Sequence, residues 1–184
     1  GRSIVETGCA ETDFETACRL VHVEQDHIVN ANGMVMTPGY VDIHSHGAWG
    51  SSFDDGEKGI TTARAGHMAH GTTRQVLSLI TNPIDVICGN LKTVHDMMPD
   101  RPDILGAHLE GPFLAMPRKG AHDPNCLVDP TPDLVSRMLD AADGCLRQIT
   151  IAPELPHGID AIRRFFLAGV VPAVGHCDAD YQTA

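Results

Sequence analysis

Short apolar runs alternate with amphipathic stretches along most of this chain, beginning near residue 38. Apolar, β-branched runs of strand length predict five strands, at residues 40–44, 73–80, 104–110, 148–153 and 170–176. The intervening stretches carry apolar residues at helical spacing and predict helices over residues 57–70, 83–98, 132–142 and 157–168. This alternation is typical of βα units around a parallel sheet, so the predicted fold class is α/β.

The number of predicted units leaves two architectures open. A closed (β/α)8 TIM barrel takes about 250 residues, whereas this chain has 184. Five units therefore form either an open five-stranded sheet or only the first part of a barrel. Residues 178–184 have the pattern of the beginning of another helix, which favours a partial barrel and an incomplete chain. Residues 1–37 are less regular, with short strands expected at 19–23 and 27–29.

Composition and charge exclude some kinds of partner. The formal net charge of −11 argues against nucleic acid or an anionic membrane surface as the main partner. No segment has the length of apolar sequence needed to span a bilayer, and the N-terminus lacks a signal-peptide pattern. Six cysteines are scattered without a C-x-x-C pair. We expect reduced, mostly packed thiols in a cytoplasmic protein.

The first candidate chemistry lies at the end of the first predicted strand, where His44 and His46 are two residues apart. Because side chains alternate across a strand, we expect both imidazoles on the same side. Two such nitrogens form half of a divalent-metal site. The alternative is a pair of polar residues in a turn.

Other predicted strands also end in metal-ligating residues. Glu110 ends the third strand and His176 ends the fifth, and histidine and carboxylate are ligands that zinc prefers. Taken singly, Glu110 could cap a turn and His176 could be a hydrogen-bonded core residue. His108 lies deeper in the third strand and is expected to be packed, or to support the ligands, and not to be a ligand itself. Glu154, after the fourth strand, is expected to bond to a backbone amide or support the site.

The loop after the third strand is a further candidate. Residues 117–124 contain Arg118, Lys119, Gly120 and His122, a set suited to an oxygen-rich or anionic ligand. The alternative is a solvated surface loop. No role is assigned to the remaining histidines, which are His22, His27, His67, His70, His95 and His157.

Five segments of the chain together resemble the amidohydrolase superfamily and, within it, the N-acetylglucosamine-6-phosphate deacetylase family. They are MTPGYVDIHSHG, GAHLEGPFL, KGAHDP, ITIAPE and VPAVGHCDADY, in that order. The resemblance implies a TIM barrel joined to a small β-sandwich domain, often as a homodimer. Residues 1–37 would then be a remnant of the small domain, and residues 38–184 the N-terminal part of the barrel. The implied reaction removes acetate from N-acetylglucosamine 6-phosphate and leaves glucosamine 6-phosphate.

The resemblance also assigns site residues. Glu110 and His176 would bind the main catalytic metal, and His44 and His46 a second one bridged by the same glutamate. The residues that would contact the sugar are Ala121, through its backbone, and His122. Zinc is the default ion, in one or two copies.

Other parts of the family pattern do not occur in this sequence. A further metal-binding histidine, the general-base aspartate and a phosphate-binding arginine are all expected beyond residue 184. The chain by itself is therefore expected to be inactive and, with its exposed strand edges, to associate. Two alternatives stay open: a hydantoinase-like or dihydroorotase-like cyclic-amide hydrolase, and an inactive metal-binding fragment.

Overall fold

The computed structural model describes residue 22, residue 24 and residues 28–184. The chain divides into two units, residues 1–38 and residues 39–184. In the first unit, residues 28–38 contain a turn in which the amide of Asn32 donates a hydrogen bond to the Asn30 side chain (2.8 Å). The predicted site residues all lie in the second unit.

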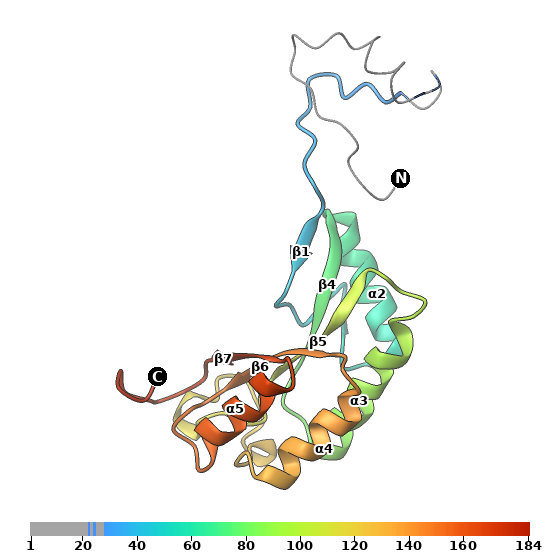
Figure 1. The fold of residues 1–184 in the computed structure, drawn as a ribbon. Helices are drawn as coiled ribbons and strands as arrows, with labels where there is room; N and C mark the ends of the chain where they lie inside the picture. Colours follow the sequence, from blue (N-terminus) through green and yellow to red (C-terminus); the bar gives the residue numbers. More distant parts are fainter. Residues whose placement is uncertain (1–21, 23, 25–27) are drawn as a thin grey trace. The chain divides into compact units, whose positions relative to one another are not determined.

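A five-stranded parallel sheet forms the centre of the second unit (Figure 1). Its strands, in spatial order, are β1 (Tyr40–Asp42), β4 (Thr72–Leu79), β5 (Ile104–Glu110), β6 (Leu146–Ile151) and β7 (Val171–Val174). Each strand pairs with the next in sequence order, all in parallel. This order, with a curl visible in Figure 1, fits the first part of a TIM barrel and confirms the predicted fold class.

Four α-helices connect these strands. They are α2 (Gly56–Ala69), α3 (Ile84–Met97), α4 (Pro132–Ala142) and α5 (Gly158–Leu167). Neighbouring helices contact one another, α2 with α3, α3 with α4 and α4 with α5. The described helices include none that is both long and apolar enough to cross a bilayer.

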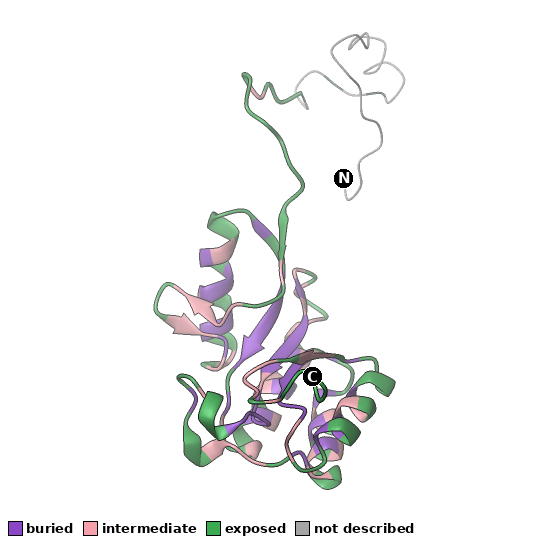
Figure 2. Ribbon diagram, turned by 90° about the vertical axis from the view of Figure 1, so that its left-hand side faces the viewer, coloured by how far each residue is buried: buried purple, intermediate pink, exposed green. Residues whose placement is uncertain are grey.

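The hydrophobic core lies between this helical layer and the sheet. Leu77 and Leu79 of β4, Leu109 of β5 and Ile149 of β6 are fully buried, as is Phe165 of α5. Figure 2 shows the buried residues concentrated along the central strands and on the inner sides of the helices. The strong amphipathic pattern of the sequence follows from this two-layer arrangement.

Most element boundaries agree with prediction to within two residues, and β5 and α4 agree at both ends. The first strand differs by two residues at its C-terminal end, because β1 ends at Asp42 and does not reach His44. Residues 19–23 and 27, where short strands were expected, are mostly outside the described residues. Ile28 and Val29 are described and are not in a strand, so that part of the prediction is wrong.

A small antiparallel hairpin was not predicted. Strands β2 (Gly47–Ala48) and β3 (Ser51–Ser52) form it directly after the His44–His46 segment. Two-residue strands are too short to have a hydrophobic period, so the sequence carries no pattern for them. Two short 3₁₀ helices, η2 (Met116–Arg118) and η3 (Pro124–Cys126), lie in the long loop after β5.

Candidate metal centre

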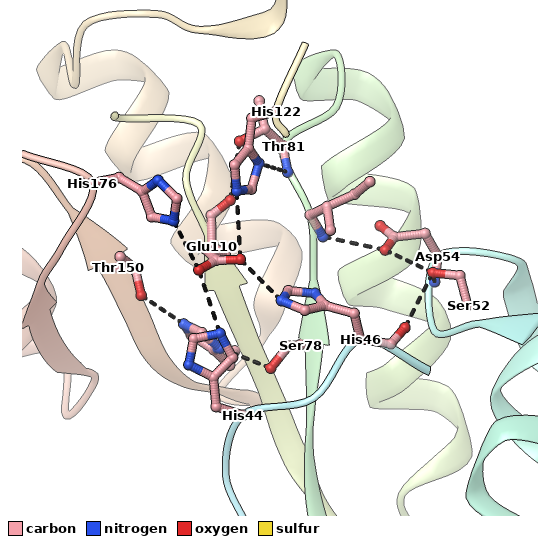
Figure 3. Close-up of polar contacts among 12 residues, drawn as sticks. His44, His46, Ser52, Asp54, Ser78, Thr81, Glu110, His122, Thr150 and His176 are labelled. Atoms are coloured by element: carbon pink, nitrogen blue, oxygen red, sulfur yellow. Dashed lines mark hydrogen bonds and ion pairs between the residues drawn. The ribbon is translucent and has the colours of Figure 1, made fainter. Parts of the chain in front are cut away.

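Glu110, the last residue of β5, lies at the centre of a cluster of imidazoles (Figure 3). Parallel strands end at the same edge of a sheet, so the loops after β1, β5 and β7 converge here. The four histidine Nε2 atoms contact the two carboxylate oxygens of this one residue. The distances are 3.4 Å from His44 and 3.1 Å from His176 to Oε1, and 2.9 Å from His46 and 3.4 Å from His122 to Oε2.

The structure therefore brings together all four predicted metal-site residues, and it adds His122 to them. Two groups of ligand atoms are each compact enough to hold an ion, one formed by His44, His46 and Glu110 and the other by Glu110, His122 and His176. Glu110 is shared by both groups.

The His44–His46 segment is a turn and not the end of a strand, so the strand argument for its geometry is wrong. Asp42 shapes the turn instead. Its carboxylate accepts hydrogen bonds from the His44 amide (2.9 Å) and the Ser45 hydroxyl (2.7 Å). An aspartate that bonds to its own backbone two residues on is a standard turn-forming device. Both imidazoles nevertheless reach Glu110, because the turn directs them there.

The hairpin after this turn is held by Asp54. Its carboxylate accepts hydrogen bonds from the Ile80 amide (3.2 Å), the Asn90 side chain (3.1 Å) and Ser52 (3.3 Å). Burial raises the pKa of Asp54, and these hydrogen bonds act in the opposite direction. The contacts join the hairpin to the end of β4 beside His46 (Figure 3).

His108 is fully buried below the cluster, as predicted for a packed residue. Its two ring nitrogens bond to Ser78 Oγ (2.8 Å) and Thr150 Oγ1 (2.9 Å). Burial, followed by the nearby His44, lowers the pKa of His108 to about 4. The ring is therefore neutral near pH 7, and with both nitrogens already bonded it has none free for a metal.

Glu110 is strongly favoured in its ionised form. The hydrogen bond from His46 is the largest cause, and it lowers the pKa of Glu110 to about 2 against the opposing effect of burial. The same hydrogen bond raises the pKa of His46. A carboxylate that stays charged at the centre of several imidazoles is a site for a cation.

The second ring nitrogens distinguish His176 from His122. Nδ1 of His176 lies 2.8 Å from the backbone carbonyl of Arg118, and a carbonyl can only accept, so this nitrogen carries the proton. Its Nε2, 3.1 Å from Glu110 Oε1, can then offer a lone pair to a metal, or donate to the carboxylate when the ring is doubly protonated. Nδ1 of His122 instead accepts from the Thr81 amide (3.4 Å), so its proton is on Nε2. The second-nitrogen contacts thus leave Nε2 of His176 able to bind a metal and make Nε2 of His122 a hydrogen-bond donor.

The spacing of these atoms fits a divalent ion. Tetrahedral zinc with bonds of about 2.1 Å separates its ligand atoms by about 3.4 Å, close to the four contacts around Glu110. Ligating histidines nearly always donate their other N–H to a fixed acceptor. His176 meets this condition, whereas Nδ1 of His46 is buried without a hydrogen-bond partner among the described residues.

The charged residues of the 117–124 loop are engaged within the protein. Arg118 pairs with Asp178 (2.7 Å), and Lys119 donates to the backbone carbonyls of Gly120 (3.1 Å) and His122 (3.2 Å). These contacts order the loop around His176, and they leave Ala121 exposed next to the cluster.

Two further residues have supporting contacts. Glu154 accepts a hydrogen bond from the Asp178 amide, which confirms the backbone-amide prediction. His67, to which no role was assigned, lies 3.1 Å from the Gly47 carbonyl and 3.7 Å from Asp42. It was missed because helices of a barrel were expected to face away from the site. His67 reaches the hairpin and the turn from α2.

A parallel βα sheet with histidines and a glutamate at its strand ends has the arrangement of part of a TIM barrel with a candidate metal site. No protein-family model matches the chain. It is 28% identical over 169 residues to an N-acetylglucosamine-6-phosphate deacetylase of Lysinibacillus sphaericus, covering 88% of this chain and 43% of the relative. The same enzyme of Vibrio furnissii is 32% identical over 152 residues, covering 80% and 38%.

Solved structures give the same result. N-acetyl-D-glucosamine-6-phosphate deacetylase from Mycobacterium smegmatis, a mutant in complex with N-acetyl-D-glucosamine-6-phosphate, superposes with a TM-score of 0.76 at 40% identity, covering 79% of this chain and 38% of the other. The Thermotoga maritima enzyme has a similar fold (TM-score 0.72, 24% identity, covering 79% and 39%). The resemblance seen in the sequence is confirmed, and the chain spans about two fifths of the length of these curated relatives.

Proposed function

We propose that the protein containing this chain is a metal-dependent amide hydrolase that removes acetate from N-acetylglucosamine 6-phosphate and yields glucosamine 6-phosphate. The observation that carries the proposal is the convergence of four imidazoles on Glu110 at the carboxyl ends of the strands. The similarity to deacetylases over most of the chain supports the same activity.

In this proposal Glu110 and His176 hold the principal ion, and His44 and His46 hold a second ion that shares Glu110. A divalent ion at this position would supply electrophilic activation of the amide carbonyl and of the attacking water. Zinc is the default from the ligand types, although iron or manganese accepts the same residues.

His122 is proposed as a substrate-binding residue. Its Nε2–H is directed into the cluster, and a substrate oxygen that replaced the Glu110 contact would accept this hydrogen bond. Ala121 is exposed beside it, and we propose that its backbone contacts the sugar.

Amide hydrolysis also needs a group that takes a proton from water and returns it to the leaving amine. We place this group on an aspartate outside the present residues. Asp42 and Asp54, which flank the His44–His46 turn, are each occupied by hydrogen bonds that hold the turn and the hairpin.

The remaining expectations belong to the same proposal. Residues 1–37 are assigned to a small β domain and residues 38–184 to the barrel, and the intact protein is proposed to be a homodimer. Cys88, Cys126, Cys145 and Cys177 are free thiols, which fits a cytoplasmic location.

The test is acetate release by the protein produced from its complete reading frame. We expect turnover of N-acetylglucosamine 6-phosphate by the metal-loaded protein and loss of turnover after chelation, restored by zinc. Hydantoin and N-acetylglucosamine without the phosphate serve as control substrates. Rapid hydantoin hydrolysis without acetate release would contradict the proposal and favour a cyclic-amide hydrolase.

A further inference from the structure

A chain of buried polar side chains lies between α2 and the sheet, where apolar packing is the rule. Arg64 of α2 and Gln75 of β4 are both completely buried. Burying a guanidinium is costly unless it is paired and hydrogen-bonded. Arg64 is paired with Asp103 (Nε to Oδ2, 3.0 Å), which also accepts two hydrogen bonds from Arg101. Because burial of the Arg64 guanidinium costs free energy, we asked what its contacts do in the structure.

The chain continues from Arg64 to Gln75. Arg64 Nη1 donates to Gln75 Oε1 (2.7 Å), and this contact fixes which way the Gln75 amide points. The amide nitrogen must then face the opposite way, toward β1. There Gln75 Nε2 donates to Asp42 Oδ2 (3.2 Å) and to the Ser45 hydroxyl. The parallel register places Asp42 directly beside Gln75, so the contact follows from strand pairing.

Asp42 is the residue that shapes the His44–His46 turn. One of its carboxylate oxygens accepts the His44 amide, and the other accepts both Ser45 and Gln75. Gln75 therefore has no hydrogen bond with either imidazole. It donates hydrogen bonds to Asp42 and Ser45, the two residues whose side chains stabilise the turn.

We propose that Gln75, oriented by Arg64, is a positioning residue for the His44–His46 half of the metal site. It holds Asp42 and Ser45 so that the turn directs both imidazoles at Glu110. The proposal deepens the proposed metal-dependent function and rests on it for its metal-binding readout, although the shape of the turn can be measured without any metal.

Gln75→Glu separates this role from a purely structural one. Glutamate has the shape of glutamine and still accepts the hydrogen bond from Arg64, so the buried arginine keeps its partner on β4. It has no N–H to donate, and it places a second carboxylate against Asp42. The turn should therefore be disturbed, and the two facing carboxylates also lower stability, so a control that is destabilised elsewhere is needed.

The experiment compares wild type, Gln75→Glu and a control, Met138→Ala, all in the protein from the complete reading frame. Met138 is fully buried on α4, away from the turn, so its truncation lowers stability alone. Thermal midpoints are measured first. Exchange of the His44 amide is then followed by NMR in metal-free protein, and Co²⁺ affinity is measured by absorption titration.

We expect Gln75→Glu to lower the thermal midpoint, as Met138→Ala does, but also to speed His44 amide exchange at least tenfold and to weaken Co²⁺ binding at His44 and His46 about 10- to 100-fold, as loss of outer contacts of ligands typically does. Met138→Ala should lower the midpoint and leave both other readouts at wild-type values. Unchanged His44 exchange in Gln75→Glu, or an equal change in Met138→Ala, would overturn the proposal. If the wild type binds no Co²⁺, the proposed metal-dependent function fails, and the positioning role is decided by His44 exchange alone.

Discussion

The two sides of Glu110 are built by different means. On one side, His176 and His122 are fixed through their own rings, by the Arg118 carbonyl and the Thr81 amide. On the other side, His44 and His46 are fixed through the backbone of a turn, and Nδ1 of His46 has no described partner. The His44 side chain is also 45% exposed, against 7% for His122.

This difference predicts that the two sides of Glu110 bind a metal ion with different affinity. A ring whose tautomer is set by a backbone carbonyl presents a bare Nε2 to an ion without rearrangement, and this preorganisation favours tight binding. A ring positioned only through its backbone must still order itself when an ion binds. We therefore expect a tight site at Glu110 and His176 and a weaker one at His44 and His46.

Glu110→Gln should have the largest effect, because this carboxylate belongs to both sites. We expect loss of bound metal from both, and a fall in acetate release of about a thousandfold or more, since several kcal/mol of transition-state stabilisation depend on the metal. Metal content and acetate release are measured together. The control is Glu154→Gln, which changes a carboxylate at the next strand end and should retain metal. Retention of both ions by Glu110→Gln would contradict the assignment.

Replacing each histidine of the ring-fixed side by alanine should separate ligand from donor. His176→Ala is expected to lose the tight ion and activity together. His122→Ala is expected to keep the ion and to lose about 10- to 100-fold in kcat/KM, the value of a hydrogen bond to a charged or strongly polarised group. The measurements are metal content and steady-state kinetics of each variant. Loss of the tight ion from His122→Ala would show that His122 is a ligand after all.

Titration of metal-free wild type with Co²⁺ should resolve two steps. The first is expected at Glu110 and His176 and the second at the turn, with affinities about 10- to 100-fold apart, because only the first has its outer contact in place. His46→Ala should remove the second step and leave the first. If two Co²⁺ ions instead bind in a single step with equal affinity, the two sides of Glu110 do not differ as metal sites.

The smallest expected effect is a change in folding stability at Asp103, the carboxylate that pairs with the buried Arg64. Burial by itself raises the pKa of Asp103, but hydrogen bonds from Arg101 and Arg64 outweigh it and lower the pKa below its ordinary 3.8. Asp103 therefore adds stability fully above pH 3.8, and this part is lost as the pH falls through the lowered value. Asp103→Asn should cost about 1–3 kcal/mol at neutral pH.

Unfolding by urea at several pH values checks this prediction. The stability of Asp103→Asn should fall less steeply than that of the wild type below pH 3.8. Parallel curves for the two proteins would mean that Asp103 is not stabilised by its two arginines.

Much of this arrangement could be predicted from the sequence, for a physical reason. Buried parallel strands must be apolar and the helices that cover them amphipathic. The sequence pattern therefore predicts both ends of β5 and of α4 correctly. Strand ends of a parallel sheet converge, so Glu110 and His176 could be placed together before any contact was known.

The parts that could not be predicted depend on side-chain contacts between distant elements. Gln75 and Arg64 are polar residues in a strand and a helix, and by pattern alone they belong to solvent-facing positions. Their burial depends on each other and on Asp103, 39 residues from Arg64. The proton position on His122 likewise depends on Thr81, 41 residues away. No local pattern records such pairings.

The most direct test of the account is anomalous diffraction at the zinc edge from crystals of the zinc-loaded protein. The account predicts a strong peak within about 2.1 Å of a Glu110 oxygen and His176 Nε2, a weaker one between His44 and His46, and no bond to His122. A peak bonded to His122 in place of His176, or the absence of any peak at Glu110, would contradict it.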